Sequence, residues 1–147
     1  MAAIIVGAMF KTDFAVRFAD VDNAGIFYYP RFFHAFHVAF EKWWEEEFER
    51  GYHLILNEDM VGFPAVHIEC DFKKPVVFGE PYEIHVGVKR LGNTSVTFRY
   101  ELRHRDTGDL HAATDTTKAV VDMNTFKART PPEEIRKAFE AMLIEDV

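Results

Sequence analysis

The chain has 147 residues, of which 48% are hydrophobic and 28% are charged. This length and composition predict a single ordered domain over residues 1–147. The formal net charge of −7 argues against nucleic acid as a general partner. Cys70 is the only cysteine and has no partner for an internal disulfide, which favours a reducing compartment such as the cytoplasm.

The N-terminal residues 1–10 are apolar but too few to span a membrane, and they lack the basic start of a secretion signal. We therefore expect an N-terminal extension or an edge segment there, and no association with a membrane. Apolar residues alternate over residues 11–18, which predicts a first strand with Phe14, Val16 and Phe18 facing the core.

The clearest helix signal covers about residues 30–50, where apolar residues recur at steps of three and four without an interrupting glycine. Pro30 suits the first helical position, where a missing N–H is harmless, and Gly51 is placed to end the helix. Large aromatic side chains, Trp43 and Trp44 among them, occupy more than one face. We therefore expect other elements to wrap around this helix.

Four strands are predicted after the helix, because apolar and polar residues alternate there and turn-like segments separate the runs. The apolar positions lie in the runs Val66–Phe72, Tyr82–Val88, Val96–Leu102 and, less regularly, 110–123. One-sided alternation with short turns is typical of an antiparallel sheet with one buried face. A short helix after Pro131 and Pro132 completes the predicted α+β arrangement, in which a five-stranded antiparallel sheet surrounds one long helix.

The segment between the first strand and the long helix combines a carboxylate, a glycine turn and the start of a helix. Its pattern is D-x-A-G-x-x-x-Y-P, formed by Asp22, Ala24, Gly25, Tyr29 and Pro30. This pattern resembles the signature of the 4-hydroxybenzoyl-CoA thioesterase family, and the order of predicted elements resembles that family over nearly the whole chain after residue 10. The resemblance implies a hotdog fold and the hydrolysis of an acyl-CoA thioester.

Thioester hydrolysis needs an activated nucleophile and donors that stabilise the oxyanion on the carbonyl. Free N–H groups at the start of a helix carry a partial positive charge, and a turn at Gly25 can fold Asp22 back toward them. The resemblance implies that Asp22 attacks the thioester or activates water, and that the main-chain N–H of Tyr29 polarises the carbonyl. Both roles of Asp22 stay open. The structural alternative is a turn-capping aspartate.

Tyr29 also bears on the substrate, because some bacterial relatives that act on aliphatic acyl-CoAs have a histidine at the matching position. The tyrosine favours an aryl or bulky acyl group similar to 4-hydroxybenzoyl. A short-chain aliphatic acyl-CoA remains an alternative substrate. A non-catalytic hotdog protein that binds acyl or aromatic ligands is the alternative from another functional class.

Two basic clusters resemble, by region, the positions that the family uses for the CoA nucleotide. One cluster comprises Lys89, Arg90, Asn93, Thr94 and Ser95, and the other comprises Lys127 and Arg129. For both clusters, ordinary solvated charge is the alternative.

The seven histidines do not predict a metal site, although His34 and His37 lie three residues apart on the expected helix. No third ligand has a recognisable spacing with them, so we expect no metal and no cofactor apart from the CoA of the substrate. The resemblance implies that two domains pair to extend the sheet into a dimer. A tetramer is common in the family, and Trp43 or Trp44 are candidates for its contacts.

Overall fold

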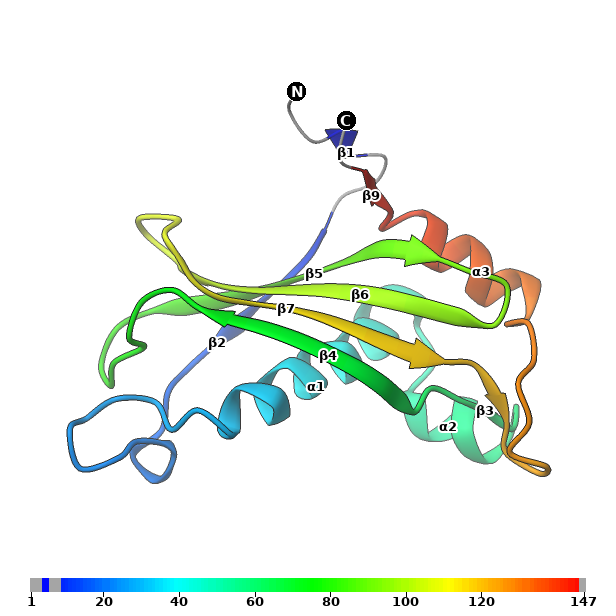
Figure 1. The fold of residues 1–147 in the computed structure, drawn as a ribbon, viewed down its shortest axis with the longest axis horizontal. Coiled ribbons are helices and arrows are strands. Elements are labelled where there is room, and N and C mark those ends of the chain that lie inside the picture. Colours follow the sequence, from blue (N-terminus) through cyan, green and yellow to red (C-terminus); the bar gives the residue numbers. More distant parts are fainter. Residues whose placement is uncertain (1–3, 6–8, 146–147) are drawn as a thin grey trace.

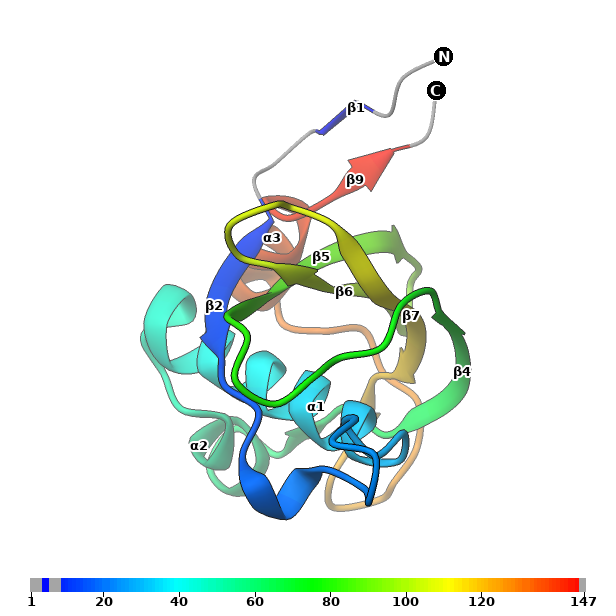
Figure 2. The same ribbon diagram turned by 90° about the vertical axis from the view of Figure 1, so that its left-hand side faces the viewer.

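A five-stranded antiparallel sheet curls around one long helix in the computed structural model, which describes residues 4–5 and 9–145 (Figures 1 and 2). The spatial order of the strands is β2 (Phe10–Phe14), β5 (Tyr82–Leu91), β6 (Ser95–His104), β7 (Leu110–Ala119) and β4 (Ala65–Phe72). The helix is α1 (Arg31–Trp43), and Figure 2 shows the strands around it on three sides. This architecture confirms the predicted α+β hotdog arrangement.

The remaining elements are short. They are a 3-10 turn (Phe18–Asp20), a π turn (Trp44–Phe48), α2 (Tyr52–Asn57), β3 (Val61–Gly62), β8 (Val121–Asp122), α3 (Glu133–Glu140), β1 (Ile4–Ile5) and β9 (Ile144–Glu145). Strands β3 and β8 pair, as do β1 and β9. Most of the predicted N-terminal extension lies outside the described residues. Within the described part of the chain, no helix has both the length and the apolar character needed to cross a bilayer.

The core forms where the aromatic face of α1 meets the inner face of β6. The inward side chains of β6 from Val96 to Leu102 are at most 2% exposed, as their alternation predicts. Phe36 stacks on Tyr100 with ring centroids 5.4 Å apart, and Phe40 meets Phe98 edge to face at 5.2 Å. Such aromatic pairs add about 0.5–1.5 kcal/mol each beyond the burial of their area, so they fix α1 against the centre of the sheet.

The end of the long helix differs from the prediction. Regular α-helical geometry stops at Trp43, a π turn follows, and Glu49 ends it in the left-handed conformation with φ 60°. Gly51 does not end this helix; it precedes α2 with φ −59°. A π turn aligns residues five apart, and Trp43 stacks on Phe48 at 5.9 Å. The helix therefore ends in a π turn with packed aromatic rings, and not at the glycine that the sequence predicts.

Trp43 and Trp44 are core residues, so the expectation that they contact another subunit is wrong. They are 3% and 0% exposed. The ring of Phe139, from α3, lies 5.4 Å from Trp43 and 5.8 Å from Trp44. Helix α3 thus covers the end of α1 and removes both indoles from solvent.

The two edge strands also depart from the expected pattern. Strand β2 ends at Phe14, and the 3-10 turn that follows leaves Phe18 79% exposed instead of inward. On the opposite edge, β4 pairs only with β7 in the part of the chain that the structure describes. Apolar side chains of this edge strand such as Val66 and Phe72 are 63% and 51% exposed. An uncovered apolar edge of this kind favours pairing with another strand.

Candidate active site

The loop that precedes α1 is organised by the carboxylate of Asp22. Its Oδ1 accepts hydrogen bonds from the N–H groups of Ala24 at 2.8 Å and Ile26 at 3.3 Å. The side chain is exposed, and Oδ2 has no hydrogen-bond partner among the described residues. One oxygen therefore holds the turn, as in an Asx turn, while the other is available to a ligand or to water.

Gly25 forms the tight point of this loop. Its φ is +75°, a conformation that glycine adopts without penalty. Its N–H donates to the carbonyl of Asp22 at 3.0 Å, and its carbonyl accepts from the N–H of Phe78 at 3.3 Å. The turn is thus tied to the segment that leads into β5, which fixes the direction in which Asp22 leaves the chain.

Among the described residues, the main-chain N–H of Tyr29 is free just before α1 begins. Tyr28 donates to the carbonyl of Asp20 at 2.8 Å, and Phe32 donates to the carbonyl of Tyr29 at 3.2 Å. Pro30 has no N–H to offer. Within the described residues, the N–H of Tyr29 has no acceptor. It lies at the positive end of the helix, where an anion or a polarised oxygen is favoured.

A cavity of about 320 Å³ is lined in part by Tyr29, and we call it the Tyr29 cavity. Its lining consists of Ile26, Phe27, Tyr29, Phe32, Phe72, Lys73, Lys74, Pro75 and Val76. The rings of Phe32 and Phe72 meet edge to face at 5.1 Å, and Tyr29 approaches Phe72 at 6.4 Å. Aromatic walls with a few polar groups in the lining suit a flat apolar group.

The two basic clusters predicted from sequence meet at one place in the fold. Val120 joins them, because its N–H donates to the carbonyl of Thr94 at 2.8 Å and its carbonyl accepts from the N–H of Arg129 at 2.9 Å. Within this group Lys89 is paired with Asp115 at 2.7 Å. The turn of Asn93, Thr94 and Ser95 and the basic residues Arg90 and Lys127 therefore lie at the same end of the sheet.

This basic end is far along the molecule from the Asp22 loop. In Figure 1 the turn between β5 and β6 lies beside α3 and β3, whereas the loop before α1 lies at the other end of the helix. A single protomer therefore does not bring the two parts of the predicted site together.

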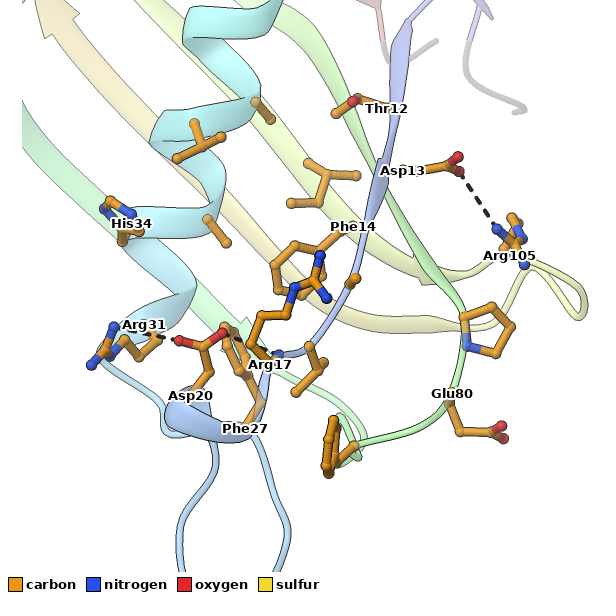
Figure 3. Close-up of a pocket in the computed structure, with 18 of the residues that line it drawn as sticks. Thr12, Asp13, Phe14, Arg17, Asp20, Phe27, Arg31, His34, Glu80 and Arg105 are labelled. Carbon is orange, nitrogen blue, oxygen red and sulfur yellow. Dashed lines mark hydrogen bonds and ion pairs between the residues drawn. The ribbon is translucent and has the colours of Figure 1, made fainter.

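A cavity larger than the Tyr29 cavity lies between β2 and α1 and has a volume of about 840 Å³ (Figure 3). Neither Asp22 nor Tyr29 lines it. Asp20 does, with its side chain 20% exposed and 3.4 Å from the guanidinium of Arg31. No local pattern predicted this cavity, because its walls come from separate elements.

A buried lysine is a further feature that periodicity did not predict. Lys118 lies on the inner face of β7, is 5% exposed, and holds its Nζ 3.8 Å from the centre of the Phe40 ring. Burial lowers its pKa to about 8, and the charge of Glu41 opposes that shift. The Phe40 ring also favours the ammonium form.

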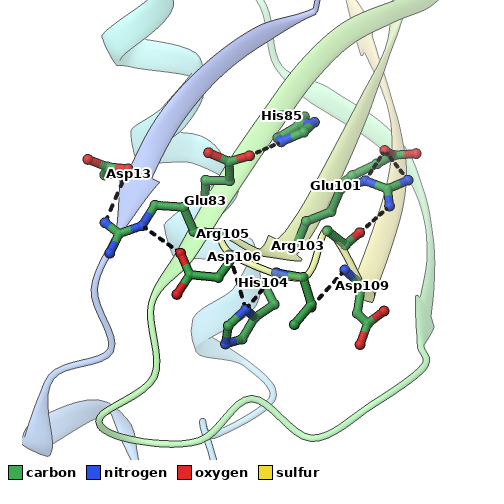
Figure 4. Close-up of polar contacts among 11 residues, drawn as sticks. Asp13, Glu83, His85, Glu101, Arg103, His104, Arg105, Asp106 and Asp109 are labelled. Atoms are coloured by element: carbon green, nitrogen blue, oxygen red, sulfur yellow. Dashed lines mark hydrogen bonds and ion pairs between the residues drawn. The ribbon is translucent and has the colours of Figure 1, made fainter.

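The histidines take part in local polar contacts. His85 and Glu83 approach within 2.7 Å on β5, and His104 accepts the N–H groups of Asp106 and Thr107 in the turn after β6 (Figure 4). His37 lies 3.2 Å from Glu41 on α1. Across the described residues, no three potential ligands gather in a way that could hold a metal ion.

Comparisons with known proteins connect this geometry with a family. A protein of Gloeothece citriformis named 1,4-dihydroxy-2-naphthoyl-CoA hydrolase is 30% identical over 87 residues, covering 59% of this chain and 60% of the relative. The match thus spans less than two thirds of that relative's length. A Synechococcus protein of the same name is 30% identical over 144 residues, covering 88% of this chain and 87% of the relative.

The fold is likewise shared. The crystal structure of a thioesterase-superfamily protein from Jannaschia sp. CCS1 superposes with a TM-score of 0.84 at 28% identity, covering 92% of this chain and 93% of that one. Residues 16–139 match the family model described as the thioesterase-like superfamily, so the chain belongs to this superfamily.

Proposed function

We propose that the protein hydrolyses an acyl-CoA thioester to a carboxylic acid and free CoA, with aryl acyl groups favoured. The observation that carries the proposal is the Asp22 carboxylate, which has one oxygen held by the turn and the other unbonded among the described residues. It lies in the loop that leads to the free N–H of Tyr29. Membership of the superfamily and the names of the two relatives support the same reaction.

The chemistry requires attack on the carbonyl carbon and departure of the thiolate of CoA. In one route, Asp22 Oδ2 accepts a proton from water, and the resulting hydroxide attacks. In the other, Oδ2 attacks directly, and water then hydrolyses the mixed anhydride. Both routes cleave the C–S bond, and the thiolate leaves with a proton from solvent. The N–H of Tyr29 stabilises the oxyanion in either case, which in comparable sites lowers the barrier by about 2.7–4 kcal/mol.

The Tyr29 cavity supports an aryl substrate, because Phe32 and Phe72 offer ring edges and faces to a planar acyl group. The relatives' names point to a dihydroxynaphthoyl group, whereas the signature resembles that of a 4-hydroxybenzoyl enzyme. We propose a single or fused aromatic acyl group as the class. No cofactor is needed beyond the CoA of the substrate, and the cytoplasm is the proposed compartment.

The basic end of the sheet contributes to the same proposal through self-association. Strand β4 has an unpaired edge within the described residues. If two copies pair antiparallel through β4, a two-fold axis relates them and their strands run in opposite directions. The basic end of one copy then lies beside the Asp22 loop of the other. We therefore propose a dimer in which Arg90 and Lys127 of one copy serve the CoA of the other copy's site. A tetramer stays a prediction.

The test uses Asp22→Asn, because asparagine keeps an oxygen that can accept from Ala24 and Ile26 but has no carboxylate. Turnover should fall by roughly 10²–10⁴-fold with little change in stability. Thiol release is followed with 5,5′-dithiobis(2-nitrobenzoic acid) over benzoyl-, 4-hydroxybenzoyl-, 1,4-dihydroxy-2-naphthoyl-, acetyl- and decanoyl-CoA.

The matched control is Asp122→Asn, since Asp122 Oδ1 holds a similar turn by accepting from Asn124 at 2.7 Å and Thr125 at 3.2 Å. This variant should keep its turnover. Near-normal turnover by Asp22→Asn would remove Asp22 from the reaction. A preference for acetyl- or decanoyl-CoA would contradict the aryl assignment. Tight binding without hydrolysis by the unmodified protein would favour the ligand-binding alternative.

A further inference from the structure

The cavity between β2 and α1, which we call the β2–α1 cleft, has the walls of a binding site and lies apart from the Tyr29 cavity. Arg31, Ala35 and Val38 line it at helical spacing, whereas Tyr29 and Phe32 line the Tyr29 cavity from another face of the same segment. Phe27 is the one residue that lines both. The apolar lining residues of the cleft include Phe14, Val16, Phe27, Ala35, Val38, Ala39 and Ile84.

The cleft also carries cations that lack partners. Its charged lining residues are Arg17, Arg31, Lys42 and Arg105 against Asp13, Asp20 and Glu80. Arg31 is paired with Asp20 at 3.4 Å, and Arg105 approaches Asp13 at 3.9 Å. Among the described residues, no carboxylate lies within ion-pair distance of the Arg17 guanidinium or the Lys42 ammonium. A local excess of positive charge on a chain of net charge −7 is complementary to an anionic ligand.

Arg17 is the best placed of these cations. Its main-chain N–H donates to Asp20 Oδ2 at 3.2 Å, which anchors the backbone from which its side chain extends. In Figure 3 the side chain of Arg17 lies in the space between β2 and α1, and only this main-chain bond is drawn to it. A guanidinium can bind a carboxylate through two parallel hydrogen bonds.

We propose that the β2–α1 cleft binds an apolar carboxylate, whose body lies against Phe14, Phe27 and Val38 and whose carboxylate meets Arg17. Aryl and alkyl acids share this chemistry, and a volume of about 840 Å³ lies within the usual range for small-molecule sites. The acid released by thioester hydrolysis belongs to the same class of ligand. The identification of the ligand with this product rests on the proposed function. The cleft would then hold product on the side of α1 away from the reacting thioester.

Isothermal titration calorimetry on the full chain tests the proposal, with 2-naphthoate and decanoate as the aryl and alkyl arms. At least one acid should bind at one site per chain. The neutral 2-naphthamide and the variant Arg17→Gln should each weaken binding at least tenfold. Lys11→Gln is the matched control, because Lys11 is an exposed cation of β2 that does not line the cleft.

A second variant, Val38→Trp, fills the cleft from a position that is already 36% exposed. It should abolish acid binding and retain both its circular dichroism and its thioester hydrolysis. Asp22→Asn should do the reverse, losing hydrolysis while binding the acid normally. Absence of saturable binding by both acids, or binding that survives Val38→Trp, would overturn the proposal. Either result leaves the hydrolysis assay free to support the proposed function.

Discussion

The buried ammonium of Lys118 should make the stability of the protein depend on pH. Its pKa is about 8 in the folded protein and 10.5 in the unfolded chain. Between these values the unfolded state binds more protons than the folded state, so the free energy of unfolding rises with pH. Below pH 8 the burial of the charged ammonium lowers the free energy of unfolding by its full amount, and this loss disappears as the pH passes 10.5.

The size of the effect follows from the two pKa values. A single group with these values adds about 2 kcal/mol to the free energy of unfolding between pH 7 and pH 9.5. The range stops at pH 9.5 because tyrosines of the unfolded chain ionise above pH 10, whereas burial raises the pKa of Tyr52 to about 12. That difference has the opposite sign and lowers stability at higher pH.

Lys118→Met isolates the contribution of the Lys118 ammonium to the pH dependence, since methionine keeps the length and apolar character of the side chain without a titrating group. Urea unfolding of both proteins at pH 7.0 and 9.5, at one protein concentration, gives the difference in free energy of unfolding. From pH 7.0 to pH 9.5, the free energy of unfolding of the unmodified protein should rise by about 2 kcal/mol relative to that of the variant. Other titrating groups cancel, apart from Glu41 and His37, whose interactions with Lys118 are removed. A shift below about 0.5 kcal/mol would refute the reasoning.

Three further substitutions test the loop, the core and an exposed aromatic side chain. In Gly25→Ala the new Cβ meets open space, but the backbone keeps φ +75°, which strains an alanine. The free energy of unfolding should therefore fall by about 1–2 kcal/mol, and thiol release should fall at least ~10-fold. Unchanged turnover would contradict this. Phe40→Ala should cost about 3–5 kcal/mol in urea unfolding because Phe40 is 0% exposed. Phe18→Ala should stay within about 0.5 kcal/mol because Phe18 is 79% exposed, and equal losses would contradict the burial argument.

Local periodicity was enough to predict the sheet and the start of the helix. The alternation in β6 placed Phe98 and Tyr100 inward correctly, because side-chain direction in a strand depends only on neighbouring positions. The exposure of Phe18 and the burial of Trp43 depend on longer-range features. The first follows from a 3-10 turn, and the second from Phe139, which lies 96 positions further along the chain (139 − 43). Such contacts leave no local trace in the sequence.

The candidate site was likewise predictable only in part. The D-x-A-G pattern located the Asp22 loop, and the catalytic and turn-capping interpretations were weighed as alternatives. The pattern did not indicate that one carboxylate oxygen would cap the turn at Ala24 and Ile26 and leave the other without a hydrogen bond among the described residues. The β2–α1 cleft was missed altogether. Its walls come from β2, α1 and the segment before β5, and no spacing rule connects residues that the fold alone brings together.

The π turn after α1 constrains the length of the chain as well as its composition. One residue in an α-helix corresponds to a rotation of about 100°, so deleting any of Glu45, Glu46 or Glu47 would move Phe48 off the face it shares with Trp43 and Trp44. Substituting the same glutamates changes only solvated side chains. This stretch should therefore accept many amino-acid exchanges among homologues while admitting almost no gaps.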